Sequence, residues 1–250
     1  MTEIFSIKDK VVIITGAARG IGNEISQRLA DEGAIIYGID IKFSRHKRSV
    51  EKINQIKCDI RSIKDFQKIC NEIYQKHKKI DILINNAGVT FPLKKLGFYN
   101  QTYWNKTIDV NLTAAFHCCQ SVIKHMLKNR SGSIINITSL NAERAFSLNP
   151  AYVASKGGLK MMTKALAKDW GKLGIRVNNL GPGYIRTEMT RKSFENKRLK
   201  SEREKQTLLK RWGETVDLIG PCIFLASDAS KYITGQDIYV DGGWLANGGI

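Results

Sequence analysis

Tyr152 and Lys156, four residues apart, are the pair in this sequence whose side chains are best suited to proton transfer. They begin a segment that we expect to be helical, so the two side chains project from the same helix face. An unperturbed phenol has a pKa of about 10, and a nearby ammonium group lowers that pKa by favouring the phenolate. The pair can therefore serve as a general acid or base near neutral pH, although the same spacing also occurs on exposed helices.

Two polar side chains upstream could assist such a proton transfer. Ser139 follows a short apolar segment, and its hydroxyl group could donate a hydrogen bond to a substrate carbonyl. Asn111 lies inside an expected helix over residues 101–128, where asparagine is unfavourable. That position indicates a local distortion of the helix with a functional cause.

A glycine-rich turn near the N-terminus predicts a binding site for the phosphates of a dinucleotide. Gly16, Gly20 and Gly22 lie between an expected strand over residues 10–15 and an expected helix. Glycines let the backbone approach a pyrophosphate closely, and a helix N-terminus offers free N–H groups. The spacing Gly-x-x-x-Gly-x-Gly differs from the standard Gly-x-Gly-x-x-Gly fingerprint, so the turn alone leaves a purely structural role open.

Polar or glycine residues also follow the next three expected strands. Asp40 ends the first of them, where a carboxylate can accept hydrogen bonds from the adenosine ribose. Asp59 follows the second strand, and the segment Asn86-Ala87-Gly88 follows the third. The carboxyl ends of parallel strands meet at one edge of the sheet, which is where open α/β folds bind ligands.

Short apolar strands alternate with helices along the whole chain, and this alternation predicts the fold class. We expect an α/β protein with a single Rossmann-type doubly wound domain, whose parallel sheet of about seven strands has helices on both faces. Residues 1–250 are expected to form one dinucleotide-binding catalytic domain, because no linker-like stretch divides them. The basic stretch 186–211 lacks apolar periodicity and is expected to form a mobile helical flap over the substrate. Later strands are expected at 133–137, 175–179 and 237–240, and helices at 62–78, 101–128, 152–171 and 215–226.

A series of motifs spread over nearly the whole chain resembles the short-chain dehydrogenase/reductase family. The joint match is specific, although no single motif is. In chain order the motifs are Thr15-Gly16-x-x-x-Gly20-x-Gly22, Asp59, Asn86-Ala87-Gly88, Asn111, Ser139, Tyr152-x-x-x-Lys156 and Pro182-Gly183.

The resemblance implies a catalytic tetrad. Tyr152 would be the general acid or base, and Lys156 would lower its pKa and hold the nicotinamide ribose. Ser139 would position the reacting oxygen, and Asn111 would anchor a water molecule that links Lys156 to solvent.

The resemblance also implies the residues that hold the cofactor. Asp59 would meet the adenine, and Thr187 would meet the nicotinamide carboxamide. The complete expected set is Gly16, Arg19, Gly20, Ile21, Gly22, Asp40, Asp59, Ile60, Asn86, Ala87, Gly88, Tyr152, Lys156, Pro182, Gly183, Ile185 and Thr187.

Asp40 favours NAD over NADP, because it resembles the acidic residue by which NAD-preferring members of the family exclude the 2′-phosphate. Arg19 and Lys42 favour NADP, because basic side chains there could pair with that phosphate. We expect NAD as the cofactor.

The C-terminal part of the chain resembles family members that act on sugar acids. Arg144, Arg186 and the basic stretch suit a carboxylate-bearing small molecule, and they would also suit an acidic acyl carrier protein. We therefore expect an oxidoreductase that transfers a hydride between NAD(H) and a secondary alcohol or ketone of a polyol or sugar acid. The alternatives are an NADPH-dependent 3-oxoacyl-[acyl-carrier-protein] reductase and a non-enzymatic dinucleotide-sensing or nucleic-acid-binding protein.

Composition sets wider limits on the function. The 250 residues are 42% hydrophobic and 25% charged, which is typical of a globular protein. The start of the chain lacks the apolar core of a signal peptide, and the five cysteines show no disulfide framework, so we expect a cytoplasmic protein. The histidines and cysteines form no ligand cluster, so no metal site is expected.

The net charge of +17 is concentrated in residues 41–57 and 186–211. Both segments are interpreted as solvated surface, and neither a membrane nor a nucleic-acid partner is expected. The resemblance implies a homotetramer that pairs through helices 101–128 and 152–171 and through the C-terminal strand.

Overall fold

The computed structural model of the chain describes residues 3–43, 53–92 and 98–247. Most of the basic segment 41–57 therefore lies outside the described residues, including Arg45, Lys47, Arg48 and Lys52.

The centre of the molecule is a seven-stranded sheet in the order β3-β2-β1-β4-β5-β6-β7, in which every neighbouring pair is parallel. The order reverses between β1 and β4, which makes the sheet doubly wound and confirms the predicted fold class. The strands are β1 Val11–Thr15, β2 Ile35–Asp40, β3 Ile53–Lys57, β4 Ile82–Asn85, β5 Gly132–Ile137, β6 Ile175–Pro182 and β7 Asp237–Val240.

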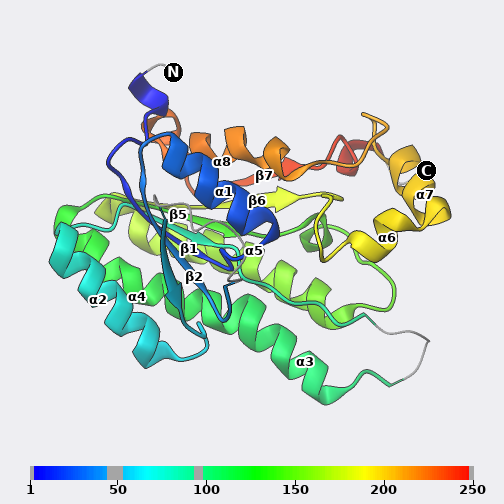
Figure 1. Ribbon diagram of the computed structural model, residues 1–250, viewed down its shortest axis with the longest axis horizontal. Coiled ribbons are helices and arrows are strands. Elements are labelled where there is room, and N and C mark those ends of the chain that lie inside the picture. The colour runs from blue at the N-terminus through cyan, green and yellow to red at the C-terminus, as the bar shows by residue number, and fades with distance from the viewer. Residues whose placement is uncertain (1–2, 44–52, 93–97, 248–250) are drawn as a thin grey trace.

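Helices cover both faces of this sheet (Figure 1). On one face α2, α4 and α5 pack against the strands, and on the other face α1 and α8 do so. The helices are α1 Gly20–Asp31, α2 Ile63–His77, α3 Gln101–Ile108, α4 Ala114–Asn129, α5 Pro150–Trp170, α6 Arg191–Glu195, α7 Lys197–Gln206 and α8 Ile219–Ala226.

Strand β1 shows why these residues form a central strand. All five of its residues are buried, so both of its faces must be apolar. Val11 and Ile13 contribute to the core under α2, α4 and α5, whereas Val12 and Ile14 contribute to the core under α1 and α8. Successive side chains of a strand point to opposite faces, and this alternation divides the core into two layers.

The helix that was expected over residues 101–128 is interrupted. A π-helical segment, Asp109–Thr113, separates α3 from α4, and Asn111 lies at its centre with 1% of its surface exposed. The predicted local distortion at Asn111 is confirmed. A π segment widens the helix by one residue and is frequently found at functional sites.

The basic stretch 186–211 contains two short helices, α6 and α7, which lie beyond the carboxyl end of β6 (Figure 1). Neither α6 nor α7 buries a residue fully, which agrees with the missing apolar periodicity in the sequence. Two expected elements also differ in extent. Strand β6 continues to Pro182, because it pairs with β7 through that residue. The expected helix 215–226 begins with a 3₁₀ turn, Thr215–Leu218.

Candidate active site

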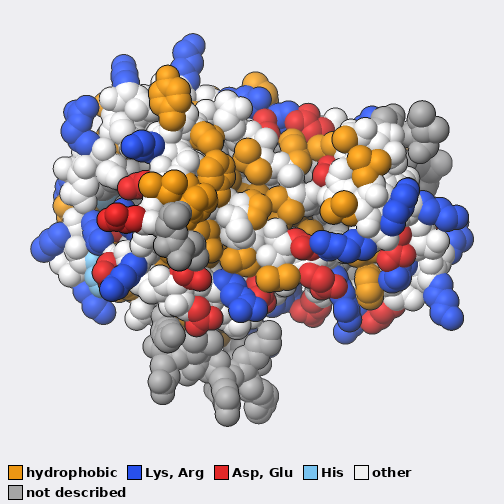
Figure 2. Space-filling model, turned by 90° about the horizontal axis from the view of Figure 1, so that it is seen from above, with side chains coloured by type: hydrophobic (Ala, Val, Ile, Leu, Met, Phe, Trp, Pro, Cys, Tyr) orange, Lys and Arg blue, Asp and Glu red, His pale blue; other side chains and the backbone are white. Residues whose placement is uncertain are grey.

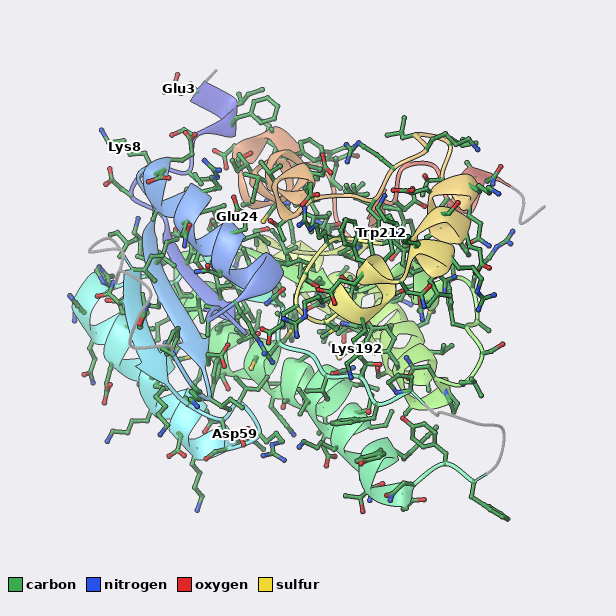
Figure 3. The ribbon with its side chains drawn as sticks, turned by 45° about the vertical axis from the view of Figure 1, so that its right-hand side comes forward. Glu3, Lys8, Glu24, Asp59, Lys192 and Trp212 are labelled. Atoms are coloured by element: carbon green, nitrogen blue, oxygen red, sulfur yellow. The ribbon has the colours of Figure 1, made fainter. Side chains whose placement is uncertain are left out.

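The residues that were expected to bind and react lie along the carboxyl edge of the sheet. The glycine turn follows β1, Asn86 follows β4, Ser139 follows β5 and Pro182 ends β6. Figure 3 shows Asp59 and Trp212 on opposite sides of this view of the molecule.

The glycine turn fits closely against the segment that follows β4. Gly16 has a φ of +68°, and a Cβ atom there would lie 2.8 Å from the Cα of Ala87. A Cβ on Gly22 would lie 2.3 Å from the carbonyl oxygen of Gly16. Helix α1 begins at Gly20, and no side chain caps it. The turn therefore needs glycines, and the start of α1 can offer N–H groups to an anion.

Hydrogen bonds fix the turn to the neighbouring strand. The hydroxyl oxygen of Thr15 accepts from the N–H groups of Asn86 and Ala87, both at 3.1 Å. The side-chain amide of Asn86 donates to the carbonyl oxygens of Thr15 and Gly16, both at 3.0 Å. These contacts hold the turn and the Asn86-Ala87-Gly88 segment together at the point where the strand order reverses.

Asp40 lies at the end of β2 against the backbone of the turn. Its Oδ2 accepts a hydrogen bond from the N–H of Ala18 at 3.0 Å. Arg19, which the sequence suggested as a partner for a 2′-phosphate, forms an exposed ion pair with Glu188 at 3.0 Å. The sequence gave no indication of this pairing, because the two residues are distant in the chain.

Asp59 lies two residues beyond the end of β3, and Arg61 holds it. The Arg61 Nε donates to both carboxylate oxygens at 3.0 Å. These hydrogen bonds hold the pKa of Asp59 below its usual value. Ile60, between the two, is buried.

Tyr152 and Lys156 occupy successive turns at the start of α5. The Lys156 Nζ donates to the carbonyl oxygen of Ile137 at 2.6 Å and lies 5.6 Å from the centre of the Tyr152 ring. Burial lowers the pKa of Lys156 to about 8. Lys156 therefore lies near Tyr152, and the Ser139 hydroxyl is hydrogen-bonded to the Tyr152 phenol.

The pKa of the Tyr152 phenol is raised, whereas the sequence led us to expect that Lys156 would lower it. Burial raises the pKa of its phenol, and the Ser139 hydroxyl opposes that rise only in part. The reason is geometric, since the Lys156 Nζ is buried as well and is hydrogen-bonded to Ile137. In the protein alone, desolvation of the phenol outweighs the neighbouring ammonium group.

The π segment brings Asn111 to the same place. Its Oδ1 accepts from the N–H of Val89 at 2.8 Å, and its Nδ2 donates to Val89 O at 2.9 Å and to Ser155 Oγ at 3.1 Å. A Cβ on Gly88 would lie 3.5 Å from Asn111 Oδ1 and 3.8 Å from Lys156 Nζ. Asn111 thus anchors the loop after β4 beside Lys156. Sequence reasoning missed Val89 and Ser155, because neither is a defining residue of a motif.

The segment after β6 lies over the glycine turn. A Cβ on Gly183 would lie 2.6 Å from Asp241 Cα, and one on Gly20 would lie 3.7 Å from the Thr187 side chain. Ile185 is buried and forms a bridge to Gly213. Thr187 therefore adjoins the glycine turn, whereas Gly183 packs against Asp241 and Ile185 pairs with Gly213.

Within residues 3–43, 53–92 and 98–247, no three His, Cys, Asp or Glu side chains are grouped so that they could hold a metal ion. In the same described part of the chain, no helix is both long enough and apolar enough to cross a membrane.

Comparison with known proteins gives matches along nearly the full chain. A family model described as "Enoyl-(Acyl carrier protein) reductase" matches residues 16–245. A 2-dehydro-3-deoxy-D-gluconate 5-dehydrogenase of Pseudoalteromonas atlantica is 37% identical, and the match covers 98% of this chain and 99% of that protein. A 3-oxoacyl-[acyl-carrier-protein] reductase of Staphylococcus epidermidis is 35% identical, with 94% and 98% covered. The crystal structure of a gluconate 5-dehydrogenase from Burkholderia cenocepacia J2315, in complex with NADP and tartrate, has a TM-score of 0.92, 33% identity and 98% coverage of both chains.

Proposed function

Since the chain belongs to the short-chain dehydrogenase/reductase family, we propose that it transfers a hydride between NAD and a secondary alcohol or ketone of a polyol or sugar acid. The observation that carries this proposal is that Tyr152, Lys156 and Ser139 lie close together, at the edge of the sheet that also holds the glycine turn. A phenol, an ammonium group and a hydroxyl group in one place suit the removal of a proton from an alcohol.

Tyr152 is the proposed general base in the oxidative direction and the general acid in the reductive direction. As a phenolate, which the Lys156 ammonium group stabilises, it accepts the hydroxyl proton of the alcohol as the carbonyl group forms and becomes a neutral phenol. The bound nicotinamide ring supplies the acceptor or donor of the hydride. Ser139 donates a hydrogen bond to the substrate oxygen, and Asn111 positions Lys156 through its hold on the loop after β4.

The dinucleotide is proposed to lie along the glycine turn, with its pyrophosphate at the start of α1 and its adenine near Asp59 and Ile60. The close approach of Gly16 and Gly22 to neighbouring backbone atoms and the uncapped N-terminus of α1 support this placement. Asn86, Ala87 and Gly88 would line the middle of the site, and the segment from Pro182 to Thr187 would cover the nicotinamide.

NAD is the proposed cofactor, and the position of Asp40 against the glycine turn, where we expect the adenosine ribose to bind, supports this choice. Arg19 is paired with Glu188, so its charge is partly compensated when a 2′-phosphate approaches. The relative from Burkholderia cenocepacia binds NADP, and that complex favours the other cofactor.

A sugar acid is the proposed substrate, which the relative from Pseudoalteromonas atlantica supports. The basic stretch 186–211 would form the flap over it, as part of one catalytic domain over residues 1–250. The second candidate is NADPH-dependent reduction of a carrier-bound 3-oxoacyl group. The relative from Staphylococcus epidermidis and the exposed Lys and Arg side chains of α7 favour that reaction.

The substrate class is tested by steady-state kinetics of the purified protein with both cofactors. We expect kcat/KM for D-gluconate with NAD to exceed that for D-glucitol, and carrier-bound 3-oxoacyl groups to be reduced poorly with NADPH. Efficient reduction of the carrier-bound substrate, with no turnover of D-gluconate, would replace the first candidate by the second.

We also propose a cytoplasmic homotetramer. A Cβ on Gly157 of α5 would meet no atom within 4 Å, and Met161 on the same helix is 61% exposed, so a partner subunit can pack there. Figure 2 shows hydrophobic side chains gathered across the face that carries α8 and β7, with Lys, Arg, Asp and Glu mixed around its margins. This mixture gives no support to a nucleic-acid partner. A particle mass of 28.1 kDa by light scattering would exclude the tetramer.

A further inference from the structure

Two hydrogen-bond donors are buried without an acceptor where α7 meets the body of the protein. They are the Nε of Arg203, on α7, and the hydroxyl group of Tyr184, just after β6. The guanidinium carbon of Arg203 lies 4.5 Å from the centre of the Tyr184 ring and 5.6 Å from the centre of the Phe146 ring. The two donors therefore belong to one cluster.

Arg203 differs from the arginines around it, because those have carboxylate partners. Arg186 pairs with Glu214 at 3.8 Å, and Arg211 forms two hydrogen bonds with Asp217 at 2.7 and 3.0 Å. Among the described residues, no carboxylate forms an ion pair with Arg203. A partly buried guanidinium that lies over aromatic rings without an ion pair is short of an anionic partner.

The cluster is connected along the chain to the proposed catalytic residues. Phe146 belongs to the segment that joins Ser139 to Tyr152, and its ring lies 5.9 Å from that of Tyr184. Tyr184 comes two residues after Pro182, at the carboxyl end of β6. The cluster therefore joins the segments that follow β5 and β6 at the carboxyl edge of the sheet, where we expect the substrate to bind.

The chemistry of the two donors selects the ligand. Burial raises the pKa of Tyr184 to about 12, so its hydroxyl group keeps its proton at neutral pH. A guanidinium group donates hydrogen bonds and carries a positive charge, and a protonated phenol can donate one more, so an anionic group with two acceptor oxygens suits the pair.

We propose that Arg203 and Tyr184 together bind the carboxylate group of the substrate, with the guanidinium on one oxygen and the phenol on the other. This inference rests on the proposed function and narrows it, because it makes the substrate a hydroxy acid rather than an uncharged polyol. Since Arg203 is on α7 and Tyr184 is on the body, the bound carboxylate also joins the flap to the body.

The test is direct binding of D-gluconate and D-glucitol, measured by titration calorimetry in the presence of the oxidised cofactor. The two probes differ only in a carboxylate and a hydroxymethyl group. We expect Arg203→Gln to weaken D-gluconate binding about 20-fold, as the loss of one charge-assisted hydrogen bond predicts. D-Glucitol binding should be unchanged.

Two further variants complete the design. Tyr184→Phe keeps the aromatic ring in the cluster and removes only the hydroxyl group, so it should weaken D-gluconate binding about fivefold. Arg28→Gln removes the same charge from an exposed ion pair with Glu24 on α1 and should bind both probes as the wild type does.

The outcomes separate this inference from the proposed function. Undiminished D-gluconate binding by Arg203→Gln would overturn the carboxylate site, and so would wild-type protein that turns over D-glucitol as well as D-gluconate. Binding of D-gluconate that depends on Arg203, without turnover by any cofactor, would support the site and overturn the proposed reaction. Wild-type protein that neither binds nor oxidises D-gluconate would overturn both.

Discussion

Tyr152→Phe is expected to lower kcat by about two to four orders of magnitude, which is the usual effect of removing a catalytic acid or base. The substitution removes only the phenolic hydroxyl group, so the ring keeps its place at the start of α5. We therefore expect the dissociation constant of the dinucleotide and the free energy of unfolding to stay close to those of the wild type. Steady-state kinetics, cofactor titration and denaturant unfolding measure the three quantities.

Tyr232→Phe is the matched control, because that tyrosine is fully exposed. It should leave kcat unchanged. If Tyr152→Phe stays within a few-fold of the wild-type kcat, Tyr152 does not carry the proton and its assignment is wrong.

Asp40→Ala is expected to shift the cofactor preference towards NADP by about a hundredfold in the ratio of kcat/KM values. About tenfold comes from weaker NAD binding, because the ribose hydroxyl groups lose a charged acceptor. About another tenfold comes from better NADP binding, because the carboxylate no longer repels the 2′-phosphate. Steady-state kinetics with both cofactors on the wild type and the variant measure the ratio.

Glu32→Ala is the control for this second result, because it removes an equal charge from an exposed side chain at the end of α1. Its cofactor ratio should equal that of the wild type. A wild-type protein that already prefers NADPH would contradict the role of Asp40 and would favour the carrier-bound substrate.

The sequence predicted the features that depend on neighbouring residues. The glycine turn, the alternation of strands and helices and the Tyr152–Lys156 spacing are local patterns, and the fold follows because parallel strands allow few topologies. Asn111 was also recognisable, because a polar residue in a helix interior needs a local reason. The π segment at Asp109–Thr113 supplies it.

Features that depend on distant contacts were not predictable in this way. The ion pair of Arg19 with Glu188 joins the glycine turn to the segment after β6. The raised pKa of Tyr152 results from its burial by residues brought together in the fold. In the sequence, nothing distinguishes Arg203 from the other basic residues of 186–211. Its position over the rings of Phe146 and Tyr184 is visible only in the structure.

The most direct test of the proposed reaction is the transfer of deuterium from D-gluconate, deuterated at every carbon-bound position, to the dinucleotide. Mass spectrometry of the reduced cofactor after turnover in ordinary water gives the result. We predict one deuterium in each molecule of reduced NAD, because the hydride passes straight from the alcohol carbon to the nicotinamide. The absence of reduced cofactor, or reduced cofactor without deuterium, would contradict hydride transfer from a sugar acid.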